Sequence, residues 1–194
     1  QKIKRQKKMR IVGGKNRGRV LFAPKGQATR PTSDRTRESI FNILSSRLEG
    51  GFHGRTVVDL FAGTGALGLE ALSRGAAHAV LVDNNREAIK IIDENVKAFG
   101  EAEKVSLQKR DATKLGPLSA GLPPASLVFL DPPYDKELVV PALNSLVENK
   151  WLAEEAICVI EAAAKENFER PTGFTQLDQR KYGKAGIHIL TFTN

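Results

Sequence analysis

The feature that most constrains this chain is the regular alternation, from residue 55 onward, of short apolar runs with stretches of helical periodicity. A strand that is followed by a helix and then by another strand returns to the same sheet through a right-handed crossover, so the strands run parallel. Helices then cover both faces of the sheet, and its strands are continuously apolar. The pattern predicts an α/β fold with strands at Thr56–Phe61, Ala79–Asp83, Val105–Lys109, Ser126–Asp131 and Ala156–Glu161 and helices at about 66–74, 85–99 and 136–148.

The last two apolar segments, Phe174–Tyr182 and Ile187–Phe192, break this alternation. Only Gly183-Lys-Ala-Gly186 separates them, which is too short for a helical crossover. A connection of this length joins antiparallel strands. We therefore expect a mostly parallel sheet with an antiparallel C-terminal hairpin at one side.

The beginning of the chain has a different character from the rest. Residues 10–24 predict two short strands around a turn that is rich in glycine and arginine. Pro31-Thr-Ser-Asp34 is typical of a helix start, with Thr32 or Ser33 as the cap, and apolar residues at helical spacing continue it over about 35–48. We expect a basic N-terminal extension of β-hairpin and helix at residues 1–54, followed by the main domain at residues 55–194.

Charge is distributed unevenly along the chain. Residues 1–37 hold 13 basic residues and one acidic residue, whereas residues 38–194 hold 17 basic and 21 acidic residues. A cationic segment in front of a mildly acidic domain indicates a polyanionic partner, although a solvated basic face that aids solubility has the same composition. The candidate contacts to a nucleic-acid backbone are the basic side chains of the predicted hairpin and helix start, namely Arg10, Lys15, Arg17, Arg19, Arg30, Arg35 and Arg37.

Composition argues against several classes of protein. With 41% apolar residues the chain is able to bury a core. The single cysteine, Cys158, allows no disulfide framework within the chain and indicates a buried strand thiol in a reducing compartment. Three dispersed histidines indicate no metal site, and no apolar stretch is long enough for a membrane span or a secretory signal. We expect a cytoplasmic monomer in which Trp151 and Tyr182 are packing residues.

A glycine-rich loop follows the first strand of the main domain. It has the spacing Gly63-x-Gly65-x-x-Gly68, and Asp83 ends the second strand 20 residues after Gly63. Glycines allow a tight turn and the close approach of a ligand, and a carboxylate after the second strand accepts hydrogen bonds from ribose hydroxyls. This pattern fits NAD as well as S-adenosylmethionine, because both ligands contain an adenosine.

Two further features favour the sulfonium cofactor. Asp59 stands just inside the end of the first strand, where a carboxylate attracts a cationic ligand and repels a pyrophosphate. The tetrapeptide Asp131-Pro132-Pro133-Tyr134 follows the fourth strand, at the edge where open α/β sheets bind ligands. The prolines stiffen this corner, Asp131 and the Pro132 carbonyl offer acceptors for the two hydrogens of an exocyclic amine, and Tyr134 offers a surface on which a base stacks. A strand-ending turn with a packed tyrosine is the alternative interpretation.

The end of the third strand adds one more candidate. Asp111 is placed to accept a hydrogen bond from the adenine amino group of the cofactor, and a surface carboxylate that caps a loop is the alternative. The predicted cofactor site therefore comprises residues from the ends of the first three strands, namely Asp59, Phe61, Gly63, Gly65, Asp83, Asn84, Asp111 and Ala112.

Two sets of motifs carry a family resemblance. Asp59-x-Phe-x-Gly-x-Gly, followed by Asp131-Pro-Pro-Tyr134, resembles the class I methyltransferases that act on exocyclic amines. The N-terminal patterns are similar to the bacterial RsmD-type 16S rRNA (guanine-N2)-methyltransferases, as is Lys181-Tyr-Gly183. Those patterns are Met9-Arg-Ile-Val-Gly-Gly-x-x-Arg-Gly-Arg19 and Arg30-Pro-Thr-x-Asp-Arg-x-Arg-Glu-x-x-Phe-Asn-Ile-Leu44.

The resemblance implies a Rossmann-like class I methyltransferase sheet, S-adenosylmethionine as cofactor and methylation of one guanine N2 amine in 16S rRNA of the 30S subunit. It also implies roles for two groups of residues. Asp131 to Tyr134 would hold the target amine, and the cofactor would be held by Asp59, Gly63, Gly65, Asp83 and Asp111.

Other functions share part of this pattern. A DNA adenine-N6 or cytosine-N4 methyltransferase uses the same tetrapeptide, but this chain lacks a large target-recognition insertion. A methyltransferase that acts on a glutamine amide is expected to carry Asn in place of Asp131. An NAD(P)-dependent oxidoreductase shares the glycine loop and leaves the tetrapeptide unexplained, and a non-catalytic RNA-binding module leaves both motifs unexplained.

Overall fold

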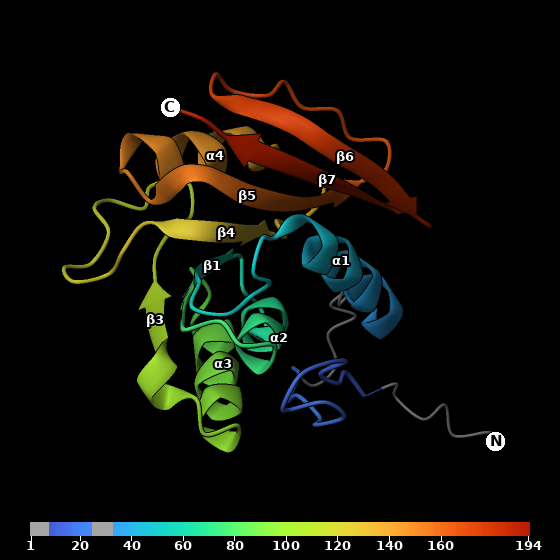
Figure 1. The fold of residues 1–194 in the computed structure, drawn as a ribbon, viewed down its shortest axis with the longest axis vertical. Coiled ribbons are helices and arrows are strands. Elements are labelled where there is room, and N and C mark those ends of the chain that lie inside the picture. Colours follow the sequence, from blue (N-terminus) through green and yellow to red (C-terminus); the bar gives the residue numbers. More distant parts are fainter. Residues whose placement is uncertain (1–7, 25–32) are drawn as a thin grey trace.

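A seven-stranded sheet forms the centre of the computed structural model, which describes residues 8–24 and 33–194 (Figure 1). The strand order is β3-β2-β1-β4-β5-β7-β6. The first five strands in this order are parallel, and β7 pairs antiparallel with both β5 and β6. Their bounds are β1 Thr56–Leu60, β2 His78–Asp83, β3 Val105–Lys109, β4 Ala125–Leu130, β5 Leu152–Ala163, β6 Phe174–Tyr182 and β7 Ala185–Phe192. The predicted α/β fold with an antiparallel C-terminal hairpin is confirmed.

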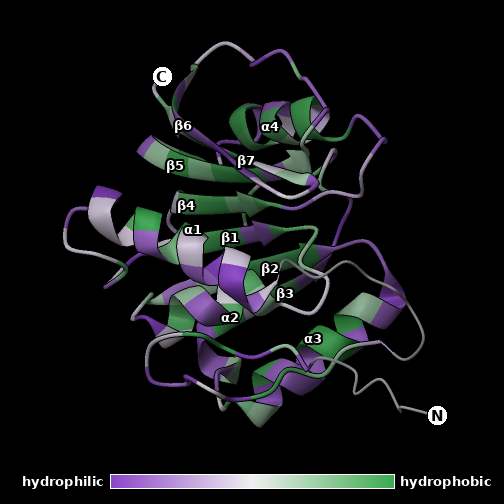
Figure 2. Cartoon of the chain, turned by 90° about the vertical axis from the view of Figure 1, so that its right-hand side faces the viewer, coloured by the Kyte–Doolittle hydropathy of each residue, from purple (hydrophilic) through white to green (hydrophobic). Residues whose placement is uncertain are grey.

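Four α-helices and one 3-10 turn of the described chain cover the two faces of the sheet. They are α1 Asp34–Arg47, α2 Ala66–Ser73, α3 Arg86–Ala98, η1 Ala102–Lys104 and α4 Val139–Glu148. Apolar residues of α1, α2 and α3 form one core cluster with alternate strand residues, and those of α4 form a second cluster on the opposite face. Because both faces are covered, the central strands are apolar along most of their length (Figure 2).

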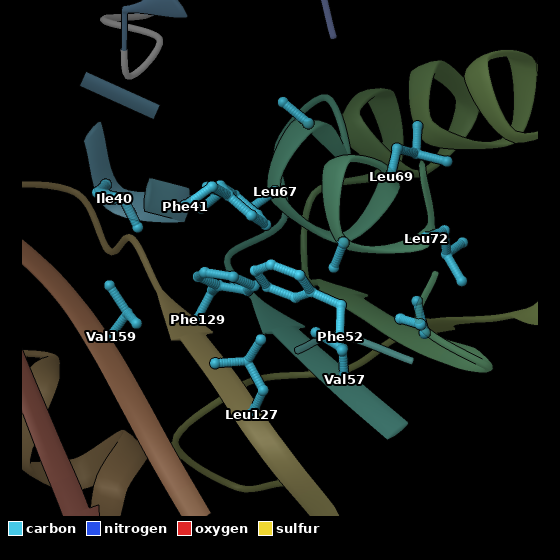
Figure 3. Close-up of a cluster of buried hydrophobic side chains, with 14 of the residues drawn as sticks. Ile40, Phe41, Phe52, Val57, Leu67, Leu69, Leu72, Leu127, Phe129 and Val159 are labelled. Atoms are coloured by element: carbon cyan, nitrogen blue, oxygen red, sulfur yellow. The ribbon is translucent and has the colours of Figure 1, made fainter. Parts of the chain in front are cut away.

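Helix α1 begins and packs as its sequence predicts. The Ser33 hydroxyl accepts a hydrogen bond from the Thr36 backbone N–H at 3.1 Å, which satisfies one of the free donors of the first turn. The buried Phe41 ring lies 5.3 Å from Phe52 and 5.4 Å from Phe129, measured between ring centroids (Figure 3). This contact fixes α1 against the middle of the sheet. The other predicted cap, Thr32, lies outside the described residues.

Residues 8–24, which we call the N-terminal arm, contain a single antiparallel bridge between Arg10 and Val20 in place of the two predicted strands. The reason is that much of the arm bonds to helix α2. The backbone N–H groups of Val12 and Gly13 donate to the Glu70 carboxylate at 3.0 and 2.9 Å. Groups that are bonded to a helix are not free to continue a strand ladder.

The arm and the sheet share one hydrophobic core. Ile11 and Leu21 of the arm belong to the same buried cluster as the residues of α1 and the sheet. The arm also covers the outer side of α2, which explains why every residue of this helix is buried. The close approach requires Gly14, because a Cβ atom there would lie 2.0 Å from the Ser73 carbonyl oxygen. A boundary at residue 54 therefore separates two segments of the chain but does not divide the core.

Three predictions about individual buried residues are confirmed. Trp151 is buried and its indole N–H donates to the Gly116 carbonyl at 2.8 Å, and Tyr182 packs against the α1–α3 side of the core. Cys158 is a buried strand residue, and burial raises the pKa of its thiol to about 12. None of the helices in the described ranges has the length and apolarity of a membrane span.

Candidate active site

The glycine loop turns the chain sharply between β1 and α2. Phe61 has φ of 57°, a left-handed conformation that is rare for a bulky side chain, and Gly65 has φ of 81° at the start of α2. The Gly68 backbone N–H donates to Oδ2 of Asp59 at 3.0 Å. A Cβ atom on Gly68 would lie 2.2 Å from Leu81, so the absence of a side chain lets the helix sit directly on the sheet.

Asp59 lies beneath this loop, with only 1% of its surface exposed. Burial raises the pKa of its carboxyl group to about 8, and the nearby Asp83 carboxylate contributes in the same direction. Within the described part of the chain, Oδ1 of Asp59 has no hydrogen-bond partner. A cationic group above the loop would stabilise the ionised form of this carboxyl, so the residue fits the predicted preference for a positively charged ligand.

Asp83 joins the glycine loop to the end of β2. Its Oδ2 atom accepts a hydrogen bond from the Gly63 N–H at 3.0 Å, and its Oδ1 atom accepts one from the Asn85 N–H at 2.9 Å. Gly63 is exposed, and a Cβ atom there would meet only the Phe61 carbonyl oxygen, at 3.9 Å. The loop thus presents bare backbone to an open space beside a carboxylate, which suits an adenosine-containing ligand.

The tetrapeptide Asp131 to Tyr134 lies at the end of the neighbouring strand. Leu130 pairs with Leu60, and the Asp131 backbone N–H donates to the Leu60 carbonyl at 3.5 Å. This register places Asp131 beside the first residue of the glycine loop. The Tyr134 side chain is half-buried, and its hydroxyl donates to Oε1 of Glu161 at 3.4 Å.

Glu161 is the site residue that the sequence analysis did not single out. It is buried near the end of β5, one position beyond Ile160, which pairs with Leu130. Like Asp83 and Asp131, it follows an apolar strand segment, and this shared position is the sequence pattern that points to it. The residues two positions before Asp59, Asp83, Asp131 and Glu161 all belong to the core cluster under α1–α3. Because side chains alternate along a strand, the four carboxyl groups lie on one face at one edge of the sheet.

Comparison with known proteins decides the family. The model of the family described as Conserved hypothetical protein 95 matches residues 9–191. The chain belongs to this family. Ribosomal RNA small subunit methyltransferase D of Escherichia coli strain K12 is 38% identical over 156 residues, which cover 79% of this chain and 74% of the relative. The protein of the same name from Haemophilus influenzae is 31% identical over 185 residues, which cover 93% and 92% of the two chains.

A solved structure supports the same assignment. The Escherichia coli protein yhhF superimposes with a TM-score of 0.81 at 30% sequence identity, covering 96% of this chain and 99% of that chain. The resemblance to the RsmD-type methyltransferases and the predicted methyltransferase fold are confirmed.

Three further residues of the predicted cofactor site follow the ends of β2 and β3. Oδ1 of Asp111 accepts hydrogen bonds from the backbone N–H and the hydroxyl of Thr113, at 2.9 and 2.7 Å, and these bonds lower the pKa of the exposed Asp111 carboxyl group. The residue caps its loop in this way, and its contact with a cofactor stays a prediction. Ala112 is buried on the α4 side, and Asn84 is exposed beside Asp83.

The structure corrects the assignment of Arg37 to a nucleic-acid surface. Its side chain is fully buried, donates to the Arg10 carbonyl and to Oδ1 of Asp34, and lies 3.9 Å from the buried Glu70 carboxylate. A buried carboxylate requires a nearby positive charge, and Arg37 supplies one together with Arg74, 3.0 Å from Glu70. Arg37 therefore fastens the arm and α1 to α2.

The other predicted basic contacts fall into two groups. Lys15 forms an ion pair with Glu101 at 2.5 Å, and Arg19 donates to the Ala98 carbonyl while its guanidinium lies 4.6 Å from the centre of the Phe99 ring. These two side chains hold the arm against the end of α3. The remaining side chains of the set are exposed at Arg10, Arg17 and Arg35, whereas Arg30 lies outside the described residues.

An open cavity of about 680 Å³ adjoins the tetrapeptide. Its lining begins one residue after Tyr134, at Asp135, and includes Glu137, Glu166 and Phe168. Asp135 and Glu137 have φ of 58° and 51°, so the chain turns tightly where it leaves the strand end. A volume of this size is typical of sites for small organic groups such as a nucleoside. Among the residues described, no three His, Cys, Asp or Glu side chains gather into a metal-binding group.

Proposed function

We propose that this protein is an S-adenosylmethionine-dependent methyltransferase that methylates the N2 amine of a guanine in 16S rRNA. The proposal rests above all on one observation, the position of Asp131 beside the glycine loop on the face shared with Asp59 and Asp83. The rRNA substrate is supported by relatives that are named small-subunit rRNA methyltransferases and share most of their length with this chain. The specific guanine N2 amine follows from the family resemblance.

The residues at the strand ends fit the proposed cofactor. Gly63 would let the ligand approach the backbone, and Asp83 would accept hydrogen bonds from the ribose hydroxyls. Asp59 would stabilise the positive end of the ligand from beneath the loop, and Asp111 would accept a bond from the adenine amine. When bound, S-adenosylmethionine supplies an electrophilic methyl group on a sulfonium.

Asp131 and Tyr134 would prepare the amine for attack. The lone pair of a guanine N2 amine is delocalised into the ring, so the amine is a poor nucleophile. Hydrogen bonds from its two hydrogens to the Asp131 carboxylate and the Pro132 carbonyl favour a more tetrahedral nitrogen with an available lone pair. The Tyr134 ring would stack on the base, a contact worth about 1–3 kcal/mol, and Glu161 would hold that ring through the tyrosine hydroxyl. After transfer, the nitrogen loses its proton through Asp131.

The substrate would be an assembled or nearly assembled 30S particle, and the enzyme would act as a monomer. A guanine must leave its stack to reach the strand ends, at a cost of a few kcal/mol that is lowest in a single-stranded loop. The cavity that begins at Asp135 would give room for the nucleotide near the reacting amine. The exposed Arg10, Arg17 and Arg35 side chains would contact phosphates and set the position of the RNA.

The test is methyl transfer by the Asp131→Ala variant. We expect the rate to fall by at least about 100-fold, because a positioned acceptor for the reacting amine is lost, while affinity for S-adenosylhomocysteine stays within a few-fold. Labelled methyl incorporation is measured on 30S particles from cells that lack the gene, and mass spectrometry of the 16S rRNA locates the product. The matched control is Asp93→Ala on α3, which removes a carboxylate remote from the strand ends and should leave the rate within two-fold.

Three outcomes would count against the proposal. An equal loss of S-adenosylhomocysteine binding in Asp131→Ala would show that Asp131 belongs to the cofactor site. Thermal stabilisation of the wild-type protein by NAD and not by S-adenosylhomocysteine would favour an oxidoreductase. Methyl groups found on DNA adenine or cytosine in place of 16S rRNA would reassign the substrate.

A further inference from the structure

Strands β5, β7 and β6 extend beyond the end of β4 and form a wall beside the site. Pairing between β4 and β5 ends at Leu130 with Ile160, whereas pairing between β5 and β7 continues to Ala163 with Ala185. At about 3.3 Å per residue, these three further positions extend the wall about 10 Å beyond the last β4–β5 pair, along the strand direction. In Figure 1 this part of the sheet is drawn in orange to red.

The tip of this wall is the turn between β6 and β7. Tyr182 pairs with Ala185, so only Gly183 and Lys184 form the turn. The Lys184 carbonyl accepts a hydrogen bond from the Ala164 N–H at 2.8 Å, which ties the turn to the segment that follows β5. The turn is therefore held firmly at the same edge of the sheet as Asp131.

Three exposed lysines gather at this tip, and we call them the hairpin rim: Lys165, Lys181 and Lys184. Within the described part of the chain none of them forms an ion pair. The neighbouring Arg180 differs, because it pairs with Asp178 at 3.1 Å. The acidic side chain nearest in sequence to the rim, Glu166, accepts a bond from the Ala163 N–H. The rim thus keeps a net positive charge directed to solvent.

One residue of the rim, Lys181, also lines a surface cavity. An open cavity of about 300 Å³ is lined by Lys181, Arg180, Gln179, Ala164 and Gly186. Lys184 precedes β7, two strand spacings or about 10 Å to the side of β4, and Lys181 lies on β6, three spacings or about 14 Å to the side. Because the tip also extends about 10 Å beyond the end of β4, its flexible lysine side chains are placed to meet the phosphates of neighbouring nucleotides when a base lies at the tetrapeptide.

We propose that the hairpin rim binds the RNA phosphates that flank the target nucleotide. This inference rests on the proposed function, since it places the nucleotide at Asp131. The rim and the N-terminal arm would then hold the RNA on two sides of the reacting base. It also gives a role to Lys181 in the Lys181-Tyr-Gly183 segment, whose tyrosine packs into the core while its lysine stays exposed.

The test compares two double variants that remove the same charge. Lys181→Gln with Lys184→Gln removes two rim charges. The control, Lys104→Gln with Lys150→Gln, removes two exposed charges next to the N-terminal ends of β3 and β5, at the edge of the sheet opposite Asp131. Binding of a single-stranded 20-nucleotide RNA of mixed sequence is followed by fluorescence anisotropy over a salt series. We expect the rim variant to bind about three- to ten-fold more weakly at about 100 mM salt. Its slope of log affinity against log salt should fall by about 1.4, at about 0.7 per lost phosphate contact, while the control keeps the wild-type slope.

The remaining outcomes separate this inference from the proposed function. Thermal stabilisation by S-adenosylhomocysteine should be unchanged in the rim variant, which shows that the fold is intact. A rim variant with the salt slope of the control would overturn the inference while methyl transfer by the wild type still supports the function. Lower activity on 30S particles with unchanged oligonucleotide binding would indicate a protein contact and would also overturn it. Wild-type protein that binds RNA through the rim but transfers no methyl group would refute the function alone.

Discussion

The N-terminal arm and the carboxyl edge of the sheet both concentrate charge, but they use it differently. In the arm and α1, several cationic side chains have protein partners: Arg37 neutralises the buried Glu70, and the exposed Lys15 and Arg19 contact Glu101 and Phe99. At the carboxyl edge, Asp83 and Asp131 are only half-buried. A run of like charges therefore does not by itself define a binding surface.

The physical reason lies in what each region packs against. The arm covers a helix that contains the buried Glu70 carboxylate, and a buried charge is tolerated only beside a partner of opposite sign. At the strand ends, the exposed backbone of Gly63 has open space around it and lies beside the partly exposed Asp83 carboxylate. Three experiments sharpen this contrast.

The largest expected effect is on stability, in the Arg37→Met variant. Removal of the guanidinium leaves the Glu70 carboxylate with less compensation in the core, and we expect a loss of about 3–5 kcal/mol in the free energy of unfolding. Urea denaturation measures the change. The control is Arg35→Met, an exposed residue on the same helix, which should stay within about 0.5 kcal/mol of the wild type. Equal stabilities for the two variants would mean that Arg37 does not anchor the arm.

The effect expected from Asp59→Asn depends on pH and, per pH unit, is smaller than the loss expected for Arg37→Met. The pKa of Asp59 is raised to about 8 in the folded protein, so between about pH 4 and 8 the folded state holds a proton that the unfolded state has lost. The contribution of Asp59 to the free energy of unfolding therefore falls as pH rises through this range, by at most about 1.4 kcal/mol per pH unit, and is constant above it. The variant lacks this proton, so its stability relative to the wild type should increase from pH 5 to pH 8.

Chemical denaturation at several pH values, without added ligand, measures this difference. Asp111→Asn serves as the control, because the Asp111 pKa is lowered and its contribution changes only below about pH 4. Parallel stability curves for the wild type and Asp59→Asn between pH 5 and 8 would show that Asp59 is ionised throughout.

The smallest effect separates two arginines of the arm. Arg17→Gln should reduce the salt slope of RNA binding by about 0.7 and leave thermal stability unchanged, because its exposed side chain forms no ion pair with another described residue. Arg19→Gln should instead lower the melting temperature, because it loses contacts with Ala98 and Phe99. Fluorescence anisotropy and thermal denaturation of both variants check this. Identical behaviour of the two variants would mean that the contacts of Arg19 with Ala98 and Phe99 do not decide its role.

Most of the fold could be predicted because its signals are local. The helices and strands of residues 55–194 begin and end within a few residues of their predicted positions, except that β5 extends over Leu152–Ala163 and begins four residues early. Its first residues were missed because Glu154 and Glu155 interrupt the apolar pattern, and both are exposed. The glycine loop and the tetrapeptide were found because each is a contiguous motif at the end of a strand.

Two features of the structure, the position of Glu161 and the single bridge in the arm, had no local signal that stood out in the sequence. Glu161 is one acidic residue among 22, and its relation to Tyr134 depends on the register of β5 against β4. The single bridge in the arm depends on the hydrogen bonds that α2 offers to Val12 and Gly13. Both features arise from contacts between segments that are far apart in the sequence.

The order of strands and helices, the parallel sheet with its final hairpin, and the motifs at the strand ends can all be predicted from the amino-acid sequence. These follow from periodicity and short-range spacing, which act within a few residues. The burial of individual residues of the same type depends instead on tertiary packing. Arg35 and Arg37 are two positions apart on α1, yet Arg35 is exposed and Arg37 is buried. Burial depends on the segment that packs above a residue, and here that segment is the arm lying over α2.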